Sequence, residues 1–79
     1  MNLEKYNKVF TELFDVEVKE LNEDFNFGVA PNWDSFAHME LIAALEDTFD
    51  IMLDSEDIMH FGGYENGKKI LSKYNITIE

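Results

Sequence analysis

The 79-residue sequence has no cysteine, no arginine, a single proline and no long apolar run. Without cysteine the chain has no disulfide, so a hydrophobic core must hold the fold together. No apolar stretch approaches the roughly 18 residues that a membrane span needs, and residues 1–4 lack the basic start and apolar middle of a signal peptide. We therefore expect a cytoplasmic protein with no membrane span.

Positive charge is scarce as well, because 6 lysines stand against 17 acidic residues and the net charge is −11. This balance argues against nucleic acid and against anionic membranes as partners. No basic residue lies between Lys19 and Lys68, whereas acidic residues recur throughout that stretch. Such an acidic block is either a solubilising surface or a recognition surface.

Apolar residues are plentiful: they make up 46% of the chain and include 7 phenylalanines. A chain of this size buries only about 60% of the surface that it exposes when unfolded, so it supports a single core. We expect one domain, residues 1–79, and a monomer.

Helical periodicity predicts an all-α fold of four helices. Apolar residues at helical spacing predict a first helix over residues 3–14. The periodicity fades over residues 16–32, where asparagine, glycine and the only proline gather. This connection is either functional or contains a short helical turn. The residues expected to anchor it to the core are Leu21, Phe25, Phe27 and Val29.

The second helix is predicted to begin at Asp34 or Ser35, because both residue types accept hydrogen bonds from the free N–H groups of a first turn. Steps of about 100° per residue separate two faces. The face expected to meet the core carries His38, Leu41, Ile42, Leu45 and Phe49. The opposite face mixes large apolar residues with acids, which is unusual for a plain solvent face. It consists of Phe36, Met39, Glu40, Ala43, Glu46, Asp47 and Asp50.

Two shorter helices are predicted to follow. Asp54 would cap a third helix that ends near His60, because two glycines come directly after it. A fourth helix is predicted over residues 64–74, with Gly67 on its core face to permit close approach of a neighbouring helix. The tail, residues 75–79, alternates weakly and is expected to fray.

No pattern predicts catalysis. A serine nucleophile needs a base oriented by a carboxylate, but His38 is expected to point to the core and no Gly-x-Ser-x-Gly motif surrounds Ser35. Residues 50–61 lack the glycine and the final acid of a calcium-binding loop, and no phosphate-binding or dinucleotide-binding glycine pattern is present. We expect neither an enzyme nor a dedicated metal site, and we interpret His38 and His60 as packed or solvated side chains.

One pattern is specific. Asp34-Ser35-Phe36 is followed by Met39-Glu40-Leu41-Ile42, by Leu45-Glu46 and by Phe49-Asp50-Ile51. This series resembles the signature of acyl carrier proteins, in which an Asp-Ser-Leu or similar motif opens the second helix of a four-helix bundle. The resemblance covers nearly the whole chain and is tightest over residues 33–51. It implies an acyl-carrier-like bundle with a long loop between helices one and two and a short third helix.

The resemblance also implies a function. Ser35 would carry 4′-phosphopantetheine, attached by a phosphopantetheinyl transferase, and Asp34 would help that transferase to place Mg²⁺. Acyl groups would be held on the arm as thioesters for fatty acid or polyketide biosynthesis. The partners would be acyl-activating and acyl-transferring enzymes with basic docking surfaces. The residues that those enzymes would contact are Phe36, Met39, Glu40, Ala43, Glu46 and Asp47.

The sequence departs from the family pattern in several places. Phe36 replaces the usual leucine, Ala37 stands where fatty-acid carriers commonly have an acid, and residues 28–33 form a longer link before the motif. Gly62 and Gly63 occupy a site where many relatives have a serine or threonine cap. These features resemble free-standing carriers of specialised pathways.

Two alternatives remain open. An aminoacyl or peptidyl carrier, including the D-alanyl type, shares the serine, the arm and the helix order. An acidic helical interaction domain would instead use Ser35 only as a helix cap.

Overall fold

The computed structural model describes all 79 residues and contains four α-helices, one short 3-10 helix and no strand. In chain order the elements are α1 (Asn2–Phe14), η1 (Val18–Glu20), α2 (Ser35–Phe49), α3 (Ser55–His60) and α4 (Tyr64–Ser72). The predicted all-α class, the number of helices and their order are confirmed. No helix of the protein is both long enough and apolar enough to cross a membrane.

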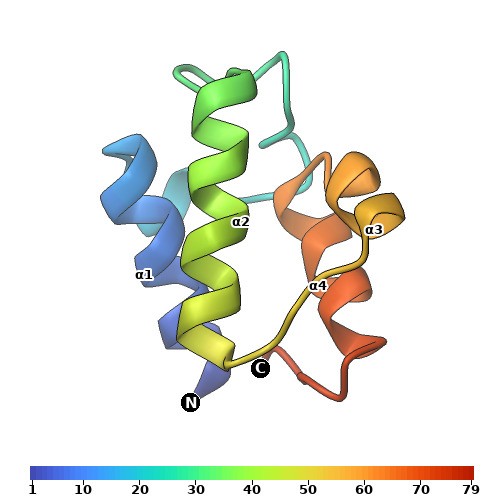
Figure 1. Cartoon of the computed structure of the whole chain (residues 1–79). Coiled ribbons are helices and arrows are strands. Elements are labelled where there is room, and N and C mark those ends of the chain that lie inside the picture. The colour runs from blue at the N-terminus through green and yellow to red at the C-terminus, as the bar shows by residue number, and fades with distance from the viewer.

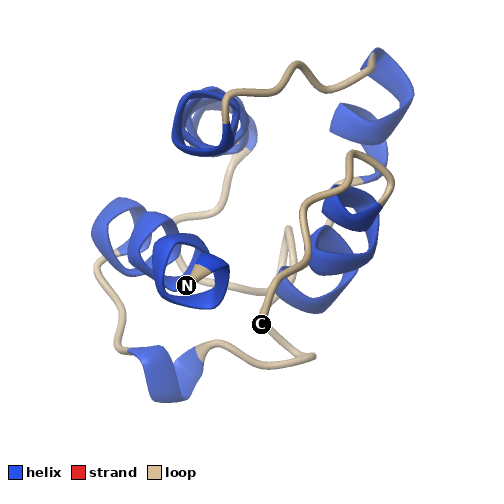
Figure 2. Cartoon of the chain, turned by 90° about the horizontal axis from the view of Figure 1, so that it is seen from below, coloured by secondary structure: helices blue, strands red, loops and turns tan.

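The four helices surround one core. α1 and α2 lie side by side and run in opposite directions, while α3 and α4 form the other side of the molecule (Figure 1). Viewed from below, α1 and α2 are seen nearly end-on, and the chain crosses from the end of α2 to α3 through an extended segment (Figure 2). The cluster of 15 buried side chains draws on every α-helix except α3, and on the connecting segments.

Aromatic side chains fill much of this core. Phe10 of α1 is fully buried, and its ring centroid lies 4.9 Å from Tyr6, 5.3 Å from Tyr64 and 5.9 Å from Trp33. Tilted and edge-on ring pairs of this kind add about 0.5–1.5 kcal/mol beyond the area that they bury. The aromatic cluster therefore connects α1, α4 and the segment that leads into α2.

The connection between α1 and α2 corrects two of the predicted anchors. Leu21 and Phe25 are buried as expected, but Phe27 is 44% exposed and Val29 is 73% exposed. Gly28 and Asn32, on either side of Val29, both have positive φ angles, 85° and 68°. The side chain that returns to the core is Trp33, which is 3% exposed.

Gly67 has the predicted role. It is buried in α4, and a Cβ atom at this position would overlap the Tyr6 hydroxyl of α1 and the Phe61 ring. The absence of a side chain thus lets α1 approach α4, and the Tyr6 hydroxyl donates a hydrogen bond of 2.6 Å to the Tyr64 carbonyl.

The C-terminal tail was predicted to fray, but the structure holds it against the start of α1. The Leu3 N–H donates to the Glu79 carbonyl at 3.3 Å, and the Asn2 side chain donates to the Thr77 carbonyl at 2.9 Å. Ile76 and Ile78 are half-buried against the core, which accounts for the weak alternation of the tail.

Candidate functional site

Ser35 is the first residue of α2, and its side chain is exposed. Asp34 precedes it with an extended backbone (φ −106°, ψ −174°), and the Asp34 carboxylate accepts a hydrogen bond from the Ala37 N–H at 2.8 Å. The structure therefore assigns the cap to Asp34. The idea that Ser35 acts as the cap is wrong, and its hydroxyl is free for other chemistry.

The inward face of α2 is as predicted. Leu41, Ile42 and Leu45 are almost fully buried, and Phe49 is half-buried. Ala37 is only 9% exposed. An acid at this position would have to be desolvated, so the alanine suits the way this helix packs.

The outward face brings most of the predicted partner-binding residues together. Phe36 is 75% exposed and Met39 is 55% exposed. Glu40, Ala43 and Asp47 are also exposed on this helix. Large apolar side chains beside carboxylates therefore form a continuous feature of the α2 surface next to Ser35.

Glu46 differs from the other residues of that face. It is half-buried, and one carboxylate oxygen accepts a hydrogen bond from the Leu53 N–H at 2.9 Å. Asp50, at the end of the same face, adopts the left-handed conformation (φ 55°) that terminates α2. Both residues help to shape the turn after α2, a role that periodicity alone does not reveal.

A pocket of about 420 Å³ opens beside Ser35. Its walls come from the first connection, from α2, and from α3 with the residues after it. The lining is mainly apolar, and Ser35 contributes a hydroxyl group. The lining residues are Phe27, Ser35, His38, Met39, Ile58, Met59 and Gly62.

A short backbone pairing places Phe27 in this wall. Residues 26 and 63 form an isolated antiparallel bridge, in which the Phe27 N–H donates to the Gly62 carbonyl at 2.8 Å and the Tyr64 N–H donates to the Phe25 carbonyl at 2.9 Å. A Cβ atom at Gly63 would overlap the end of the Asn26 side chain, which would have to move aside. The sequence does not predict this pairing, because a Gly-Gly pair after a helix pattern indicates a helix stop and not a contact with a distant segment.

His38 is one of the lining residues of the pocket and contacts three segments of the chain. Its Nδ1 atom is 3.0 Å from Trp33 Nε1, and its Nε2 atom is 2.8 Å from the Ile58 carbonyl oxygen. The imidazole and indole planes are nearly parallel, with an interplanar angle of 22° and centroids 6.1 Å apart, and the Phe27 ring meets the imidazole edge-on at 86°. Because both ring nitrogens have partners within the fold, His38 is not placed to act as a base for Ser35.

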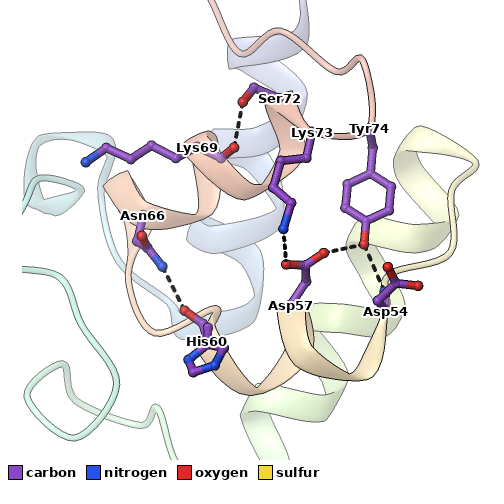
Figure 3. Close-up of polar contacts among 8 residues, drawn as sticks. All are labelled: Asp54, Asp57, His60, Asn66, Lys69, Ser72, Lys73 and Tyr74. Carbon is purple, nitrogen blue, oxygen red and sulfur yellow. Dashed lines mark hydrogen bonds and ion pairs between the residues drawn. The ribbon is translucent and has the colours of Figure 1, made fainter.

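A buried carboxylate of α3, that of Asp57, binds this helix to the residues that follow α4. Asp57 is 6% exposed and accepts hydrogen bonds from Lys73 Nζ at 2.6 Å and from the Tyr74 hydroxyl at 2.5 Å (Figure 3). The Tyr74 hydroxyl in turn accepts a hydrogen bond from the Asp54 N–H at 2.9 Å. The bonds from Lys73 and Tyr74 lower the pKa of Asp57, and the same ion pair raises the pKa of Lys73.

The site therefore combines an exposed hydroxyl, an apolar pocket and an acidic outer face. No three His, Asp or Glu side chains of the chain group closely enough to hold a metal ion. The chain matches no protein-family model and no solved structure.

Proposed function

We propose that this protein is a phosphopantetheine-dependent acyl carrier whose arm is attached to Ser35. The observation that carries the proposal is the position of the serine. Its hydroxyl is exposed at the start of α2 and lies on an apolar pocket, while Asp34 alone caps the helix. The order of four helices around a single core is compatible with an acyl-carrier-like bundle.

The residues around Ser35 suit a phosphodiester. Ser35 opens a helix of 15 residues, whose first-turn N–H groups and dipole favour an anion by about 0.3–1 kcal/mol. In the transfer, the Ser35 oxygen would bond to a phosphorus of coenzyme A and adenosine 3′,5′-bisphosphate would leave. The serine proton would pass to a base of the transferase, which also supplies the metal, so Ser35 needs no activating neighbour of its own.

An attached arm would supply the chemistry that the chain lacks. The protein has no cysteine, so the thiol of the arm would be the only one available to carry acyl groups as thioesters. The contribution of the protein is then position: α2 fixes where the arm begins, and the pocket offers apolar surface beside it.

The outer face of α2 suits brief contacts with several basic enzymes. Glu40 and Asp47 are exposed, and an exposed ion pair contributes only about 0.2–1 kcal/mol. Complementary charge chiefly speeds encounter between partners. Phe36 and Met39 would add the apolar contacts that orient the complex. Fast arrival and easy departure are what a carrier that visits successive enzymes requires.

The pocket favours an acyl cargo over an aminoacyl one. Phe27, Met39, Ile58 and Met59 line it, and an ammonium group beside these side chains would lose water without gaining a carboxylate partner. Loading assays with fatty-acid and amino-acid adenylating enzymes distinguish the two cargoes. Preferential loading of amino acids would favour the aminoacyl, peptidyl or D-alanyl type.

The proposal is tested by intact mass after incubation with coenzyme A and a permissive phosphopantetheinyl transferase. We expect the mass of one 4′-phosphopantetheine group to be added to the native protein and none to Ser35→Ala. Ser55→Ala is a matched control, because Asp54 and Ser55 form a second Asp-Ser pair at the start of α3. No gain, or a gain that survives in Ser35→Ala, would leave the acidic interaction domain as the better description.

A further inference from the structure

We propose that His38 is the positioning residue that fixes α3 against α2 beside Ser35, and that it does so as a neutral imidazole with its proton on Nε2. The structural part of this inference stands on the contacts of His38 alone. The effect that it assigns to His38 in recognition by the transferase rests on the function proposed above.

The partners of His38 determine its tautomer. The Trp33 indole nitrogen can only donate, so His38 Nδ1, 3.0 Å away, must accept. The Ile58 carbonyl oxygen can only accept, so His38 Nε2, 2.8 Å away, must donate. Only the neutral Nε2–H form satisfies both bonds. An imidazolium, or the other tautomer, would direct an N–H group at the indole N–H.

One end of this bridge is rigid. Trp33 is 3% exposed, and its ring lies 5.1 Å from Phe14 and 5.7 Å from Phe25, centroid to centroid. The indole therefore cannot swing away from the core without disrupting several aromatic contacts. The direction of its N–H group fixes the position of His38 Nδ1, and the two ring planes lie within 22° of each other.

The other end of the bridge is α3, whose apolar contact with the core comes from the half-buried Ile58. The only fully buried side chain of α3 is Asp57, whose partners Lys73 and Tyr74 directly follow α4. Ile58 lies in the last turn of α3, where carbonyl groups lack partners within the helix, and its carbonyl accepts only a longer bond of 3.4 Å from the Phe61 N–H besides that of His38.

His38 thus completes the attachment of α3 on the side of Ser35. The residue after Ile58 is Met59. Met59 and Gly62 both line the same pocket as Ser35. A change in the position of the Ile58 carbonyl would move this wall of the pocket. It would also move the apolar surface that Met59, which is 78% exposed, presents beside Met39.

The first test observes the native protein. Long-range proton–nitrogen correlation spectra of the imidazole at neutral pH should show His38 as the Nε2–H tautomer. The chain has a single tryptophan, so the indole N–H gives one signal, which should shift in His38→Phe and stay in place in His60→Phe. A protonated His38 or an Nδ1–H tautomer overturns the proposal, even if no variant can be prepared.

The second test uses amide hydrogen exchange of three variants. In His38→Phe we expect the amides of Ile58 and Phe61 to exchange about five- to ten-fold faster, as the loss of one net hydrogen bond implies, while amides of α1 keep their rates. His38→Gln, whose amide can accept at oxygen and donate at nitrogen, should restore most of the protection. His60→Phe is the matched control, since His60 is an exposed histidine on α3, the helix that also contains Ile58. Equal rates in His38→Phe and His60→Phe overturn the proposal.

The third test measures modification of Ser35 by the transferase. Displacement of α3 should raise the KM for the carrier several-fold in His38→Phe and leave kcat unchanged, with recovery in His38→Gln. An unchanged KM would remove the role in recognition while the exchange data still decide the structural bridge. If the native protein is not modified at all, the proposed function fails, and the tautomer and exchange results still stand or fall by themselves.

Discussion

Asp34 accepts a hydrogen bond from the Ala37 N–H at 2.8 Å, across the serine that opens α2. The two residues of the Asp-Ser pair therefore have separate tasks. Asp34 stabilises the first turn of the helix, and Ser35 presents its hydroxyl to solvent. Substitutions can test these tasks independently.

Loss of the cap should destabilise the fold, whereas loss of the serine should not. Asp34→Ala is expected to lower the free energy of unfolding by about 1 kcal/mol, because one first-turn N–H loses its acceptor. Asp34→Asn should keep most of the stability, since asparagine caps comparably. Ser35→Ala should unfold at the same urea concentration as the native protein. A clear loss of stability in Ser35→Ala would contradict the assignment of the cap.

Gly67→Ala should destabilise the protein even though alanine is the better helix former. The added Cβ would overlap the Tyr6 hydroxyl and the Phe61 ring, and such overpacking costs about 1–3 kcal/mol. Gly62→Ala is the matched control, because the nearest atom to a Cβ there is 3.8 Å away. Thermal unfolding followed by circular dichroism measures both. Equal midpoints for the two variants would show that α1 and α4 can separate at little cost.

Asp57 should make stability depend on pH in acid. Its pKa is lowered in the folded state by hydrogen bonds from Lys73 and Tyr74, so its contribution is present above the unfolded-state pKa of about 3.9 and is lost as pH falls through the folded-state value. Asp57→Asn should therefore be less stable than the native protein at pH 7, and the difference should shrink as the pH is lowered below 4.

Urea denaturation of both proteins from pH 7 down to pH 3 provides the comparison. Glu56→Gln, at the exposed neighbouring position of α3, controls for the loss of one negative charge. A difference between native protein and Asp57→Asn that is constant over this range would contradict the assigned cause.

Charge on the outer face of α2 should affect encounter with the transferase. At low ionic strength we expect each of the two changes in the double variant Glu40→Gln/Asp47→Asn to lower the association rate about two- to five-fold. The difference from the native protein should become smaller as the salt concentration is raised. Glu4→Gln/Glu12→Gln on α1 alters the net charge equally and should have a smaller effect. Stopped-flow measurement of the association rate at several salt concentrations compares the two double variants. Equal slowing by both double variants would indicate that only the net charge matters.

The sequence predicts the helices and their buried faces well, because both depend on periodicity. The burial of Leu41, Ile42 and Leu45 follows from their spacing alone. The choice between Asp34 and Ser35 as cap does not, since either residue type can cap and only the backbone angles decide.

Periodicity also does not predict the pocket beside Ser35, for a different reason. Its main contacts join segments that are far apart in the chain. His38 contacts the backbone carbonyl of Ile58, and because every residue type has this group, the sequence does not indicate the contact. Phe27 reaches the wall through backbone pairing with Gly62. The exposure of Phe27 and Val29 likewise does not follow from hydrophobicity, because it depends on the path of the connecting segment.

The composition of α3 has a consequence for which substitutions the fold tolerates. This helix has one buried side chain, Asp57, while Glu56, Met59 and His60 point into solvent. Mutations at those three positions should cost little folding stability, and a change at Met59 would alter the pocket that Ser35 lines. The aromatic core, by contrast, constrains α1 and α4. The exposed surface of α3 and the folding core are thus encoded by different residues of the chain.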